Sequence, residues 1–408
     1  MVFNNKQRPY AVILGLDHIN GIQTVRILAR HGVPVIGVAR NPEHYCVRTR
    51  LCERIIFTDT ASDLLVETLI QEGPSLGQKA VLYPCTDAIV SIVSEHRERL
   101  EPWYHIILPA HDTVDMLMDK TRFYAFAEKN GFPVSRTLFI HDKDEANKVA
   151  NEFSFPCIVK PPVNSIAAWD KNSKLKAYLF DTPEEFLGSY DLLSSWSPTL
   201  IVQEWIVGPV SNLYSCNCYF DKKGEPVATF VARKLRQWPP KTGDSCLGEE
   251  CRNDDVLQET LRLFKKVNYR GLGYVEMKQD SRTGKHYIVE PNIGRPTGRS
   301  AIAEAGGVEL IYSMYCDALD LPLPPQREQK YGNTRWIYFG RDFLSALHDY
   351  RKGELTLGDW LRSLRGIKVD AIFAWNDLAP FIWDLSRAVR LLLSPEERKK
   401  RDFGGPPS

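Results

Sequence analysis

Long apolar runs, a strong net charge and internal repeats are all missing from this chain of 408 residues. No apolar stretch approaches the length of a membrane span, and residues 1–10 are polar, without the apolar core of a signal peptide. The formal net charge is only +1, so no long-range field favours nucleic acid or an anionic membrane as a partner. We therefore expect no membrane span and no nucleic-acid partner.

Cysteine is present but forms no recognisable site. The 9 cysteines are scattered and odd in number, and the only close pairs are Cys216 with Cys218 and Cys246 with Cys251. Neither pair has a histidine at zinc-site spacing, and Cys216 and Cys218 would share one face of a strand as core thiols. A reduced, cytoplasmic setting fits this cysteine usage best.

The first hundred residues alternate apolar strands with helical stretches. A helix is expected from about Gly21 to His31. Buried strands are expected at residues 11–15, 33–38, 54–57, 79–83 and 106–108. Strands that alternate with helices imply a parallel, doubly wound, Rossmann-like sheet. With 43% hydrophobic and 25% charged residues the composition is that of an ordinary globular protein, and the length implies two or three domains.

The glycines argue against the dinucleotide cofactor that such a sheet often binds. The first turn runs from Gly15 to Gly21 without the G-x-G-x-x-G pattern, and the second strand ends at Arg40 with no acid placed to hold a ribose hydroxyl. An NAD-dependent oxidoreductase is therefore the weakest function considered. The turn from Pro84 to Asp87 sits at the carboxyl end of a strand, where open α/β sheets collect ligands, although its composition needs no ligand to explain it.

A hairpin with two facing acids is the most informative segment. Two predicted strands, residues 274–278 and 287–292, flank a short polar turn. This pairing places Glu276 opposite Glu290, and Asn292 shares the face of Glu290. Like charges held opposite each other destabilise a sheet unless a cation lies between them, and these all-oxygen ligands suit Mg²⁺. The alternative is a solvated hairpin whose acids pair with the lysines beside them.

Cationic residues mark the ends of several elements in the middle of the chain. A predicted helix from Thr113 to Asn130 contains Lys120, and a short apolar strand ends at Lys160 before a polar, irregular segment. A further apolar strand covers residues 200–206, and a basic stretch begins at Arg295 after the hairpin. Cations for phosphates, an apolar slot for a base and a divalent-ion site are the parts that phosphoryl transfer needs.

In this order the motifs resemble those of the ATP-grasp superfamily, which includes biotin carboxylase, D-alanine–D-alanine ligase and carbamoyl-phosphate synthase. The resemblance spans roughly residues 11–319, and within the superfamily the chain is most similar to carboxylate–amine ligases of the D-aspartate ligase type. The features that carry it are CIVKP at 157–161, KAY at 176–178, RKLR at 233–236 with Pro239, and EPN at 290–292.

The resemblance implies an α/β fold of several parts. A Rossmann-like domain would cover residues 1–112, and an α+β ATP-grasp fold would follow as a small subdomain, 113–205, and a large subdomain with the magnesium site, 206–330. Residues 331–408 would form a C-terminal extension with a helical tail. Within the large subdomain we expect a polar loop from Gln237 to Cys251.

The resemblance also implies roles for individual residues. The residues expected to bind ATP are Lys120, Lys160, Ser165, Lys176, Gln203, Glu204 and Ile206, the last three holding adenine mainly through backbone groups at a hinge. The residues expected to bind one or two Mg²⁺ ions, or Mn²⁺, are Glu276, Glu290 and Asn292. The residues expected to stabilise the transferring phosphate or an acyl phosphate are Arg295, Arg233 and Lys234.

Two features depart from the family pattern. Many relatives have a glycine-rich lid after the lysine that ends the strand, but residues 161–169 contain no glycine. Several relatives place a ribose-binding acid after the hinge, but residues 208–212 read GPVSN. The lid and ribose recognition are therefore unassigned.

The resemblance implies a reaction in two steps. A carboxylate would attack the γ-phosphate of ATP, and an amine would then attack the acyl phosphate to give an amide, ADP and phosphate. The alternatives are a nucleotide-binding regulatory protein without turnover and an ATP-grasp carboxylase.

The substrates are expected to be small, a carboxylic acid and an amine, with an amino acid as one of them. The residues expected to bind them are Asp17, His18, Asp87 and Arg299. The apolar stripe of the predicted tail helix at residues 380–393 is expected to pack on the body of the protein, with a dimer seam or a membrane-facing surface as less favoured alternatives. Because relatives are often dimers, a homodimer is also considered, with this helix as its candidate seam.

Overall fold

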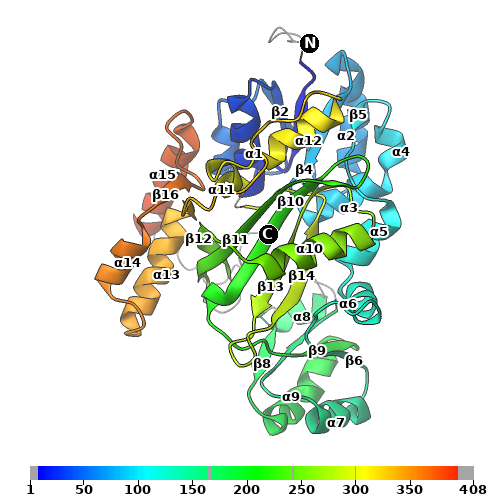
Figure 1. Cartoon of the computed structure of the whole chain (residues 1–408), viewed down its shortest axis with the longest axis vertical. Coiled ribbons are helices and arrows are strands. Elements are labelled where there is room, and N and C mark those ends of the chain that lie inside the picture. The colour runs from blue at the N-terminus through cyan, green and yellow to red at the C-terminus, as the bar shows by residue number, and fades with distance from the viewer. Residues whose placement is uncertain are drawn as a thin grey trace.

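The structure is a computed structural model that describes residues 8–162, 167–173, 175, 177–240, 243–298 and 300–393. Its described part is a mixed α/β assembly of three sheets, arranged from the N-terminal unit at the top of Figure 1 to a smaller lobe at the bottom. None of the described helices is long and apolar enough to cross a membrane. Three residues expected to bind ligands, Ser165, Lys176 and Arg299, lie outside the described residues.

The N-terminal unit is a five-stranded parallel sheet in the order β3-β2-β1-β4-β5. Its strands are β1 (Ala11–Leu14), β2 (Val35–Ala39), β3 (Arg54–Phe57), β4 (Ala80–Pro84) and β5 (Tyr104–His105). Its helices are α1 (Ile19–Arg30), α2 (Leu64–Glu72), α3 (Asp87–Glu95) and α4 (Arg97–Leu100), with short 3₁₀ turns η2 (Tyr45–Arg48) and η3 (Gly73–Leu76). The predicted parallel sheet is confirmed, although β5 forms two residues earlier in the chain than expected.

The lower lobe is an antiparallel sheet in the order β6-β9-β7-β8, with helices against it (Figure 1). Its elements are β6 (Thr137–Ile140), α7 (Lys143–Glu152), β7 (Cys157–Lys160), α8 (Ala167–Asn172), β8 (Tyr178–Phe180), α9 (Pro183–Trp196) and β9 (Leu200–Glu204). Two helices lead into it, α5 (His111–Met118) and α6 (Lys120–Lys129). The predicted single helix is therefore wrong: the chain breaks at Asp119, whose extended backbone and side chain cap α6.

The central body is a seven-stranded sheet in the order β14-β13-β10-β11-β12-β15-β16. Its strands are β10 (Leu213–Phe220), β11 (Pro226–Trp238), β12 (Asp244–Glu250), β13 (Gly271–Gln279), β14 (His286–Ile293), β15 (Arg335–Ile337) and β16 (Ile367–Asp370). The helices that follow or cover it are α10 (Asp254–Lys266), α11 (Ser300–Ala305), α12 (Leu310–Ala318), α13 (Phe339–Arg351), α14 (Leu357–Ser363) and α15 (Ala379–Leu393), with the 3₁₀ turn η4 (Val210–Asn212). The C-terminal extension is thus helical, as predicted, but it also adds two strands to this sheet.

The expected polar loop at residues 237–251 is corrected by the structure, because β11 continues to Trp238 and residues 244–250 form strand β12. β12 pairs with β11 on one side and with β15 on the other. One of its acids is paired rather than solvated: Glu249 accepts hydrogen bonds from Arg233 on β11 and from Arg335 on β15. The polar composition of these residues therefore did not predict that β12 is an inner strand of the sheet.

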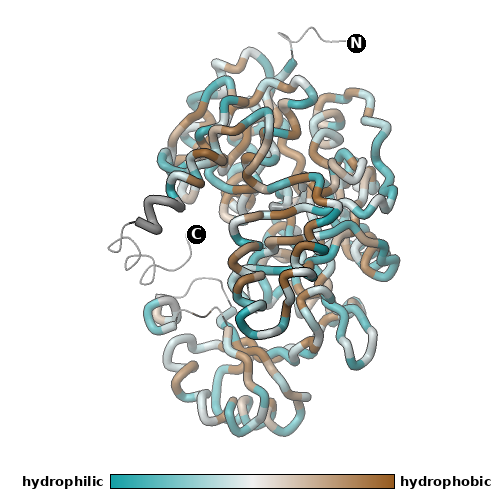
Figure 2. Tube along the Cα trace, turned by 90° about the vertical axis from the view of Figure 1, so that its left-hand side faces the viewer, coloured by the Kyte–Doolittle hydropathy of each residue, from teal (hydrophilic) through white to brown (hydrophobic). Residues whose placement is uncertain are grey.

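Burial divides the molecule into a main body and a separate lobe. Buried residues of the N-terminal sheet and of the central sheet belong to common clusters, so that Tyr83 and Tyr219, for example, lie in one core. The lower lobe has a cluster of its own, which includes Val159, Phe186 and Val202. Figure 2 shows this lobe below the main body, with apolar segments inside each. The space between the lobe and the central sheet is where the predicted ATP-binding residues should meet.

Candidate active site

The acidic hairpin lies on the face of the central sheet that carries the other predicted metal ligand. Glu276 on β13 pairs directly with Glu290 on β14, as predicted from the sequence. Asn292 lies two residues further along β14 and donates its amide to Glu290 Oε1 at 3.4 Å. The three side chains are therefore brought together, and they present carboxylate and amide oxygens to one place.

Glu290 combines solvent contact with a crowded protein environment. A large part of its surface is accessible to water. Protein atoms nevertheless surround the carboxyl, and this desolvation is the main cause that raises its pKa, followed by the charge of Glu276. Both facts hold for a side chain inside an open cleft, which water reaches but protein largely surrounds. Lys120, Asn292 and Lys160 act in the opposite direction and lower the pKa of Glu290. Two acids held together in a cleft favour a cation between them.

The two predicted phosphate-binding lysines approach the acids from the lower side of the cleft. Lys120 is the first residue of α6, directly after the cap Asp119. Lys160 is the last residue of β7, and its Nζ lies 3.3 Å from Gln203 Oε1 and 5.8 Å from the ring centroid of Tyr124. Burial lowers the pKa of Lys160, and Glu290 partly restores it. The structure thus brings two lysines and two glutamates into one electrostatic group.

The predicted hinge follows β9, between the lobe and the central sheet. The Glu204 side chain accepts the Ser154 N–H at 2.8 Å, and its carbonyl accepts the Ser135 hydroxyl at 2.5 Å, so this residue is anchored within the lobe. The Gln203 amide donates to Thr137 Oγ1 at 2.9 Å. The backbone groups of Ile206 make no hydrogen bond with other described residues, so they remain available to a base.

A further lysine at this face was not predicted as a site residue. Lys278 lies two residues from Glu276 on β13, so both side chains share the cleft face. Its Nζ lies 4.2 Å from the ring centroid of Trp205 in the hinge, and burial is the main cause that lowers its pKa to about 8; Asp280 raises it and Lys234 lowers it. The sequence could have predicted this position, because residues two apart on a strand lie on the same face and Lys278 is two residues from Glu276.

Lys234 and Arg233 lie on opposite faces of the sheet. Lys234 is buried on the cleft side, near enough to Lys278 to lower the pKa of that lysine. Arg233 pairs with Tyr214 in the register of β10 and β11, and its guanidinium donates to Glu249 at 2.7 Å. The structure therefore brings Lys234 to the predicted ATP site but does not bring Arg233 there.

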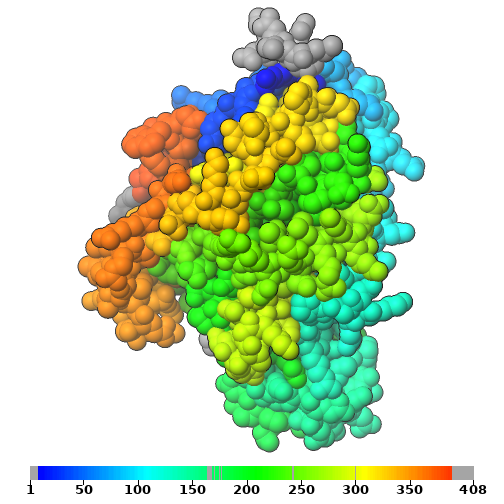
Figure 3. Space-filling model, in the orientation of Figure 1, coloured from blue at the N-terminus to red at the C-terminus, as the bar shows by residue number. Residues whose placement is uncertain are grey.

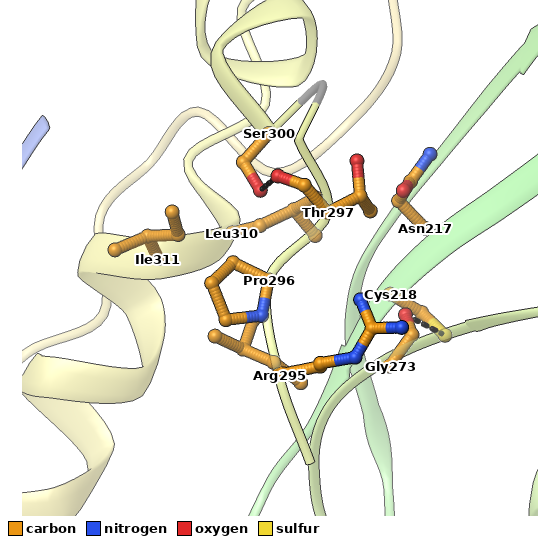
Figure 4. A pocket seen from close by; sticks show the side chains of 10 residues that line it. Asn217, Cys218, Gly273, Arg295, Pro296, Thr297, Ser300, Leu310 and Ile311 are labelled. Atoms are coloured by element: carbon orange, nitrogen blue, oxygen red, sulfur yellow. Dashed lines mark hydrogen bonds between the residues drawn. The ribbon is translucent and has the colours of Figure 1, made fainter. Parts of the chain in front are cut away.

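Arg295 joins the metal ligands to the N-terminal unit. Its Nη2 donates to Asn292 Oδ1 at 2.7 Å, its Nη1 to the Tyr274 hydroxyl at 3.3 Å, and its Nε and Nη2 to the Asp87 carboxylate. Figure 4 shows the guanidinium lying beside the strand of Gly273, below Pro296 and Thr297. The pocket of about 10 Å³ in this view has room for no more than a water-sized group.

The position of Arg295 depends on the turn that precedes it. Gly294 adopts φ +68°, and a Cβ there would lie 2.6 Å from Leu108 and 2.8 Å from Val90, so glycine is required. Its backbone N–H donates to the buried Tyr269 hydroxyl at 2.7 Å, and that hydroxyl donates to the Leu272 carbonyl at 2.7 Å. One tyrosine thus fixes the end of β14 where Arg295 leaves the sheet.

Three of the residues predicted to bind substrate lie at the carboxyl edge of the N-terminal sheet. Asp87 begins α3 and contacts Arg295. His18 begins α1; burial lowers the pKa of its imidazole, which Asp17 raises and Arg295 lowers. Asp17 accepts the backbone N–H groups of Arg40 at 3.0 Å and of Asn41 at 2.8 Å, so one of its oxygens braces the turn after β2.

A second histidine at this edge was missed in the sequence. His44 accepts the Cys46 N–H through Nδ1 and stacks near Tyr45, with ring centroids 4.1 Å apart. Burial lowers the pKa of its imidazole to about 4, an effect that Asp17 opposes and His18 adds to. No motif marks it, because only the fold brings the turn after β2 next to the start of α1.

Comparison with known proteins finds curated relatives by sequence. No protein-family model matches the chain. A D-aspartate ligase of Enterococcus faecium is 25% identical over 237 residues, which cover 55% of each protein. A formate-dependent phosphoribosylglycinamide formyltransferase of Ignicoccus hospitalis is 27% identical over 160 residues, which cover 38% of this chain and 36% of that protein. The chain thus matches about half the length of the first relative and about a third of the second.

Solved structures resemble the chain over a larger part of its length. An N5-carboxyaminoimidazole synthetase from Staphylococcus aureus has a TM-score of 0.62 at 13% identity, and the match covers 81% of this chain and 82% of that one. A biotin carboxylase from Campylobacter jejuni has a TM-score of 0.61 at 16% identity, covering 82% and 75%. The resemblance inferred from the motifs is thereby confirmed: the chain has the ATP-grasp fold, and its sequence is similar to that of a D-aspartate ligase.

Proposed function

We propose that this chain is a Mg-ATP-dependent carboxylate–amine ligase that forms an amide through an acyl phosphate and releases ADP and phosphate. The observation that carries the proposal is the register of β13 and β14, which holds Glu276 against Glu290 beside Asn292. Two lysines, Lys120 and Lys160, complete the group from the opposite side of the cleft. This is the combination of charges that a nucleotide triphosphate with its metal ion requires.

The donor set fits Mg²⁺. Two carboxylates and an amide carbonyl are hard oxygen ligands, and Mg²⁺ usually takes one or two protein carboxylates together with phosphate oxygens. Asn292 Oδ1 accepts a hydrogen bond from Arg295 at 2.7 Å, and a carbonyl oxygen has a second lone pair for a metal. When bound, one or two Mg²⁺ ions, or Mn²⁺, would neutralise charge on the phosphate oxygens.

Different residues of the cleft would bind different parts of ATP. Lys120 and Lys160 would hold the phosphates, since their charges already reach Glu290. The backbone groups of Ile206, together with those of Gln203 and Glu204, would hold adenine. Lys278, which lies against Trp205, and Lys234, whose charge reaches Lys278, would add two buried cations. Ser165 and Lys176 stay expected contacts.

Arg295 would stabilise charge as the phosphoryl group moves to the substrate carboxylate. It lies between the metal ligand Asn292 and the N-terminal unit, so it can contact an acyl phosphate formed there. Its contact with Asp87 orients the guanidinium. The acid would therefore bind next to Arg295, and Arg299 stays an expected contact.

The amine is proposed to approach along the edge formed by Asp87, His18 and Asp17. The exposed Asp87 carboxylate can accept hydrogen bonds from an ammonium group, and His18 lies close enough to Arg295 for its pKa to be lowered by it. A neutral imidazole can accept a proton from an attacking amine. The similarity to D-aspartate ligase supports an amino acid as one of the substrates.

A homodimer is part of the proposal, with α15 as its seam. Two apolar side chains of this helix, Ile382 and Leu385, are 58% and 53% exposed. The C-terminal elements lie at the edge of the main body (Figure 3), where a second copy could reach them.

A screen for ADP release tests the proposed function. Purified protein with ATP and Mg²⁺ would be given pairs of carboxylic acids and amines, with bicarbonate and substrate-free reactions in parallel. We expect ADP only when an acid and an amine are both present, and an amide in equal amount. ADP release that depends on bicarbonate would favour a carboxylase, and nucleotide binding without any turnover would favour a regulatory protein.

A further inference from the structure

A second group of metal-binding side chains lies away from the cleft, where α1 meets α11 and α12. Figure 1 shows these three helices next to one another in the upper part of the molecule. His31 directly follows α1, Glu304 lies in α11, and Glu309 directly precedes α12. One ligand atom from each lies within 4.8 Å of the others, and His31 Nε2 is 3.9 Å from Glu309 Oε1.

The local fold holds these three side chains in place. The His31 ring stacks on Tyr312 of α12, with centroids 3.8 Å apart and planes 5° apart, so the direction of its nitrogens is fixed. The turn between the two glutamates is closed by hydrogen bonds from Gly307 N–H to the Glu304 carbonyl at 3.1 Å and from Val308 N–H to the Ala303 carbonyl at 2.8 Å. Gly307 has φ +86°, which a residue with a side chain would rarely adopt.

The surroundings of this group favour an added cation, because two carboxyl groups lie close together. Two partly buried carboxylates face each other, and no described arginine or lysine forms an ion pair with either; Arg30 acts on them only from a distance. Burial and then Glu309 raise the pKa of Glu304 to about 8, and burial raises that of Glu309. Burial, Arg30 and Arg8 lower the pKa of His31, which favours the neutral imidazole that binds metals.

We propose that His31, Glu304 and Glu309 bind one divalent transition-metal ion of the Zn²⁺ type, which joins the N-terminal unit to the α11–α12 segment. An imidazole nitrogen suits Zn²⁺ and related ions, whereas Mg²⁺ prefers oxygen ligands only. Three protein ligands with water in the fourth position are a common zinc arrangement. Tetrahedral ligands lie roughly 3.4 Å apart, so the observed separations need only a small closing movement of the side chains.

The proposed ion would act on the shape of the molecule rather than on the chemistry in the cleft. His31 belongs to the N-terminal unit, and both glutamates follow the segment that carries Arg295. Folding and metal binding are linked when the ligands come from distant parts of a chain, because the site exists only in the folded state. The ion should therefore stabilise the packing of α1 against α11 and α12.

Metal titration of the full chain tests this site. Protein freed of metal by a chelator would be titrated with Zn²⁺ by calorimetry in excess Mg²⁺, which fills the all-oxygen site. We expect one bound Zn²⁺ per chain, binding at least about tenfold weaker in His31→Ala and Glu309→Gln, and unchanged binding in the control His141→Ala, an exposed histidine of the lobe. Zn²⁺ should raise the unfolding temperature of the wild type and of the control but not of the two variants.

Co²⁺ gives a second readout that separates this site from the cysteines. Bound to one imidazole and two carboxylates, Co²⁺ should give weak visible absorption without the intense near-ultraviolet bands of thiolate ligands. Glu309→Gln leaves the stacked ring of His31 in place, so its loss of binding would not come from misfolding. Equal Zn²⁺ binding by the wild type and both variants, no binding by the wild type, or thiolate bands with Co²⁺ would each overturn the proposal.

Discussion

At the scale of single residues, the account depends most on Glu290. Its carboxylate faces Glu276, lies beside Asn292 and is approached by two lysines. Glu290→Gln keeps the size of the side chain and removes the charge that would hold Mg²⁺. We expect ADP release to fall by about 100-fold or more, with an unchanged circular dichroism spectrum. Glu128→Gln, at an exposed position of α6, is the matched control and should keep full activity.

Lys278 is predicted to make the KM for ATP depend on pH. Burial lowers the pKa of this lysine to about 8, so the side chain is charged below that pH and neutral above it. Because a charged lysine attracts the phosphates, the KM for ATP should rise as the pH increases from about 7 to about 9. Lys278→Arg stays charged throughout and should flatten this rise.

The control for that experiment is Lys285→Arg, since Lys285 is exposed in the turn of the same hairpin. It should keep the wild-type pH profile of the KM. A profile of Lys278→Arg identical to that of the wild type would show that Lys278 does not contact the nucleotide.

Some site residues could be predicted from the sequence because their relation is local. Glu276 and Glu290 lie on two strands joined by a short turn, so strand alternation alone predicts that they face each other. Strand alternation also places Lys278 on the face of Glu276, but the environments of Lys278 and His44 could not be predicted in the same way. Their surroundings come from segments distant in the chain, Trp205 for the lysine and Asp17 and His18 for the histidine.

At the scale of elements, the end of β14 depends on one hydroxyl group. Tyr269→Phe would leave the Gly294 N–H and the Leu272 carbonyl without their buried partner. We expect the free energy of unfolding to fall by about 1–3 kcal/mol, measured by urea denaturation. Because Gly294 precedes Arg295, kcat should fall as well. A variant with normal stability and normal kcat would show that this hydroxyl does not position Arg295.

The parallel sheet was predictable because its strands are continuous apolar runs, such as those of β1 and β4. Strand β12 was not, because only Cys246 and Leu247 give it an apolar character. Its place in the sheet is stabilised by ion pairs of Glu249 with Arg233 and Arg335, and Arg335 is 86 residues away in the chain. Pairing of this kind leaves no periodicity in a sequence.

At the scale of the whole molecule, a buried ion pair holds the C-terminal extension to the first helix. Arg26 on α1 donates to Asp377 at 3.0 Å, with side chains 9% and 1% exposed. Asp377 also accepts the Thr49 hydroxyl at 2.9 Å. Asp377→Ala would leave the arginine buried without its partner, so we expect the free energy of unfolding to fall by about 3–5 kcal/mol.

The exposed ion pair of Lys222 and Asp320 is the control for the expected loss of stability in Asp377→Ala. Asp320 is 86% exposed and has φ +54°, which asparagine tolerates, so Asp320→Asn should change the free energy of unfolding far less than Asp377→Ala in the same denaturation experiment. Equal effects of the two substitutions would mean that the extension does not stabilise the body through Arg26.

The location of the metal ion that accompanies ATP tests the central claim most directly. A crystal of the protein with a non-hydrolysable ATP analogue and Mn²⁺ would show the ion by its anomalous scattering. We predict a peak bound by Glu276, Glu290 and Asn292, with the analogue's phosphates between it and the two lysines, Lys120 and Lys160. An analogue bound in the cleft with Mn²⁺ on other ligands, or phosphates that lie away from this hairpin, would contradict the account.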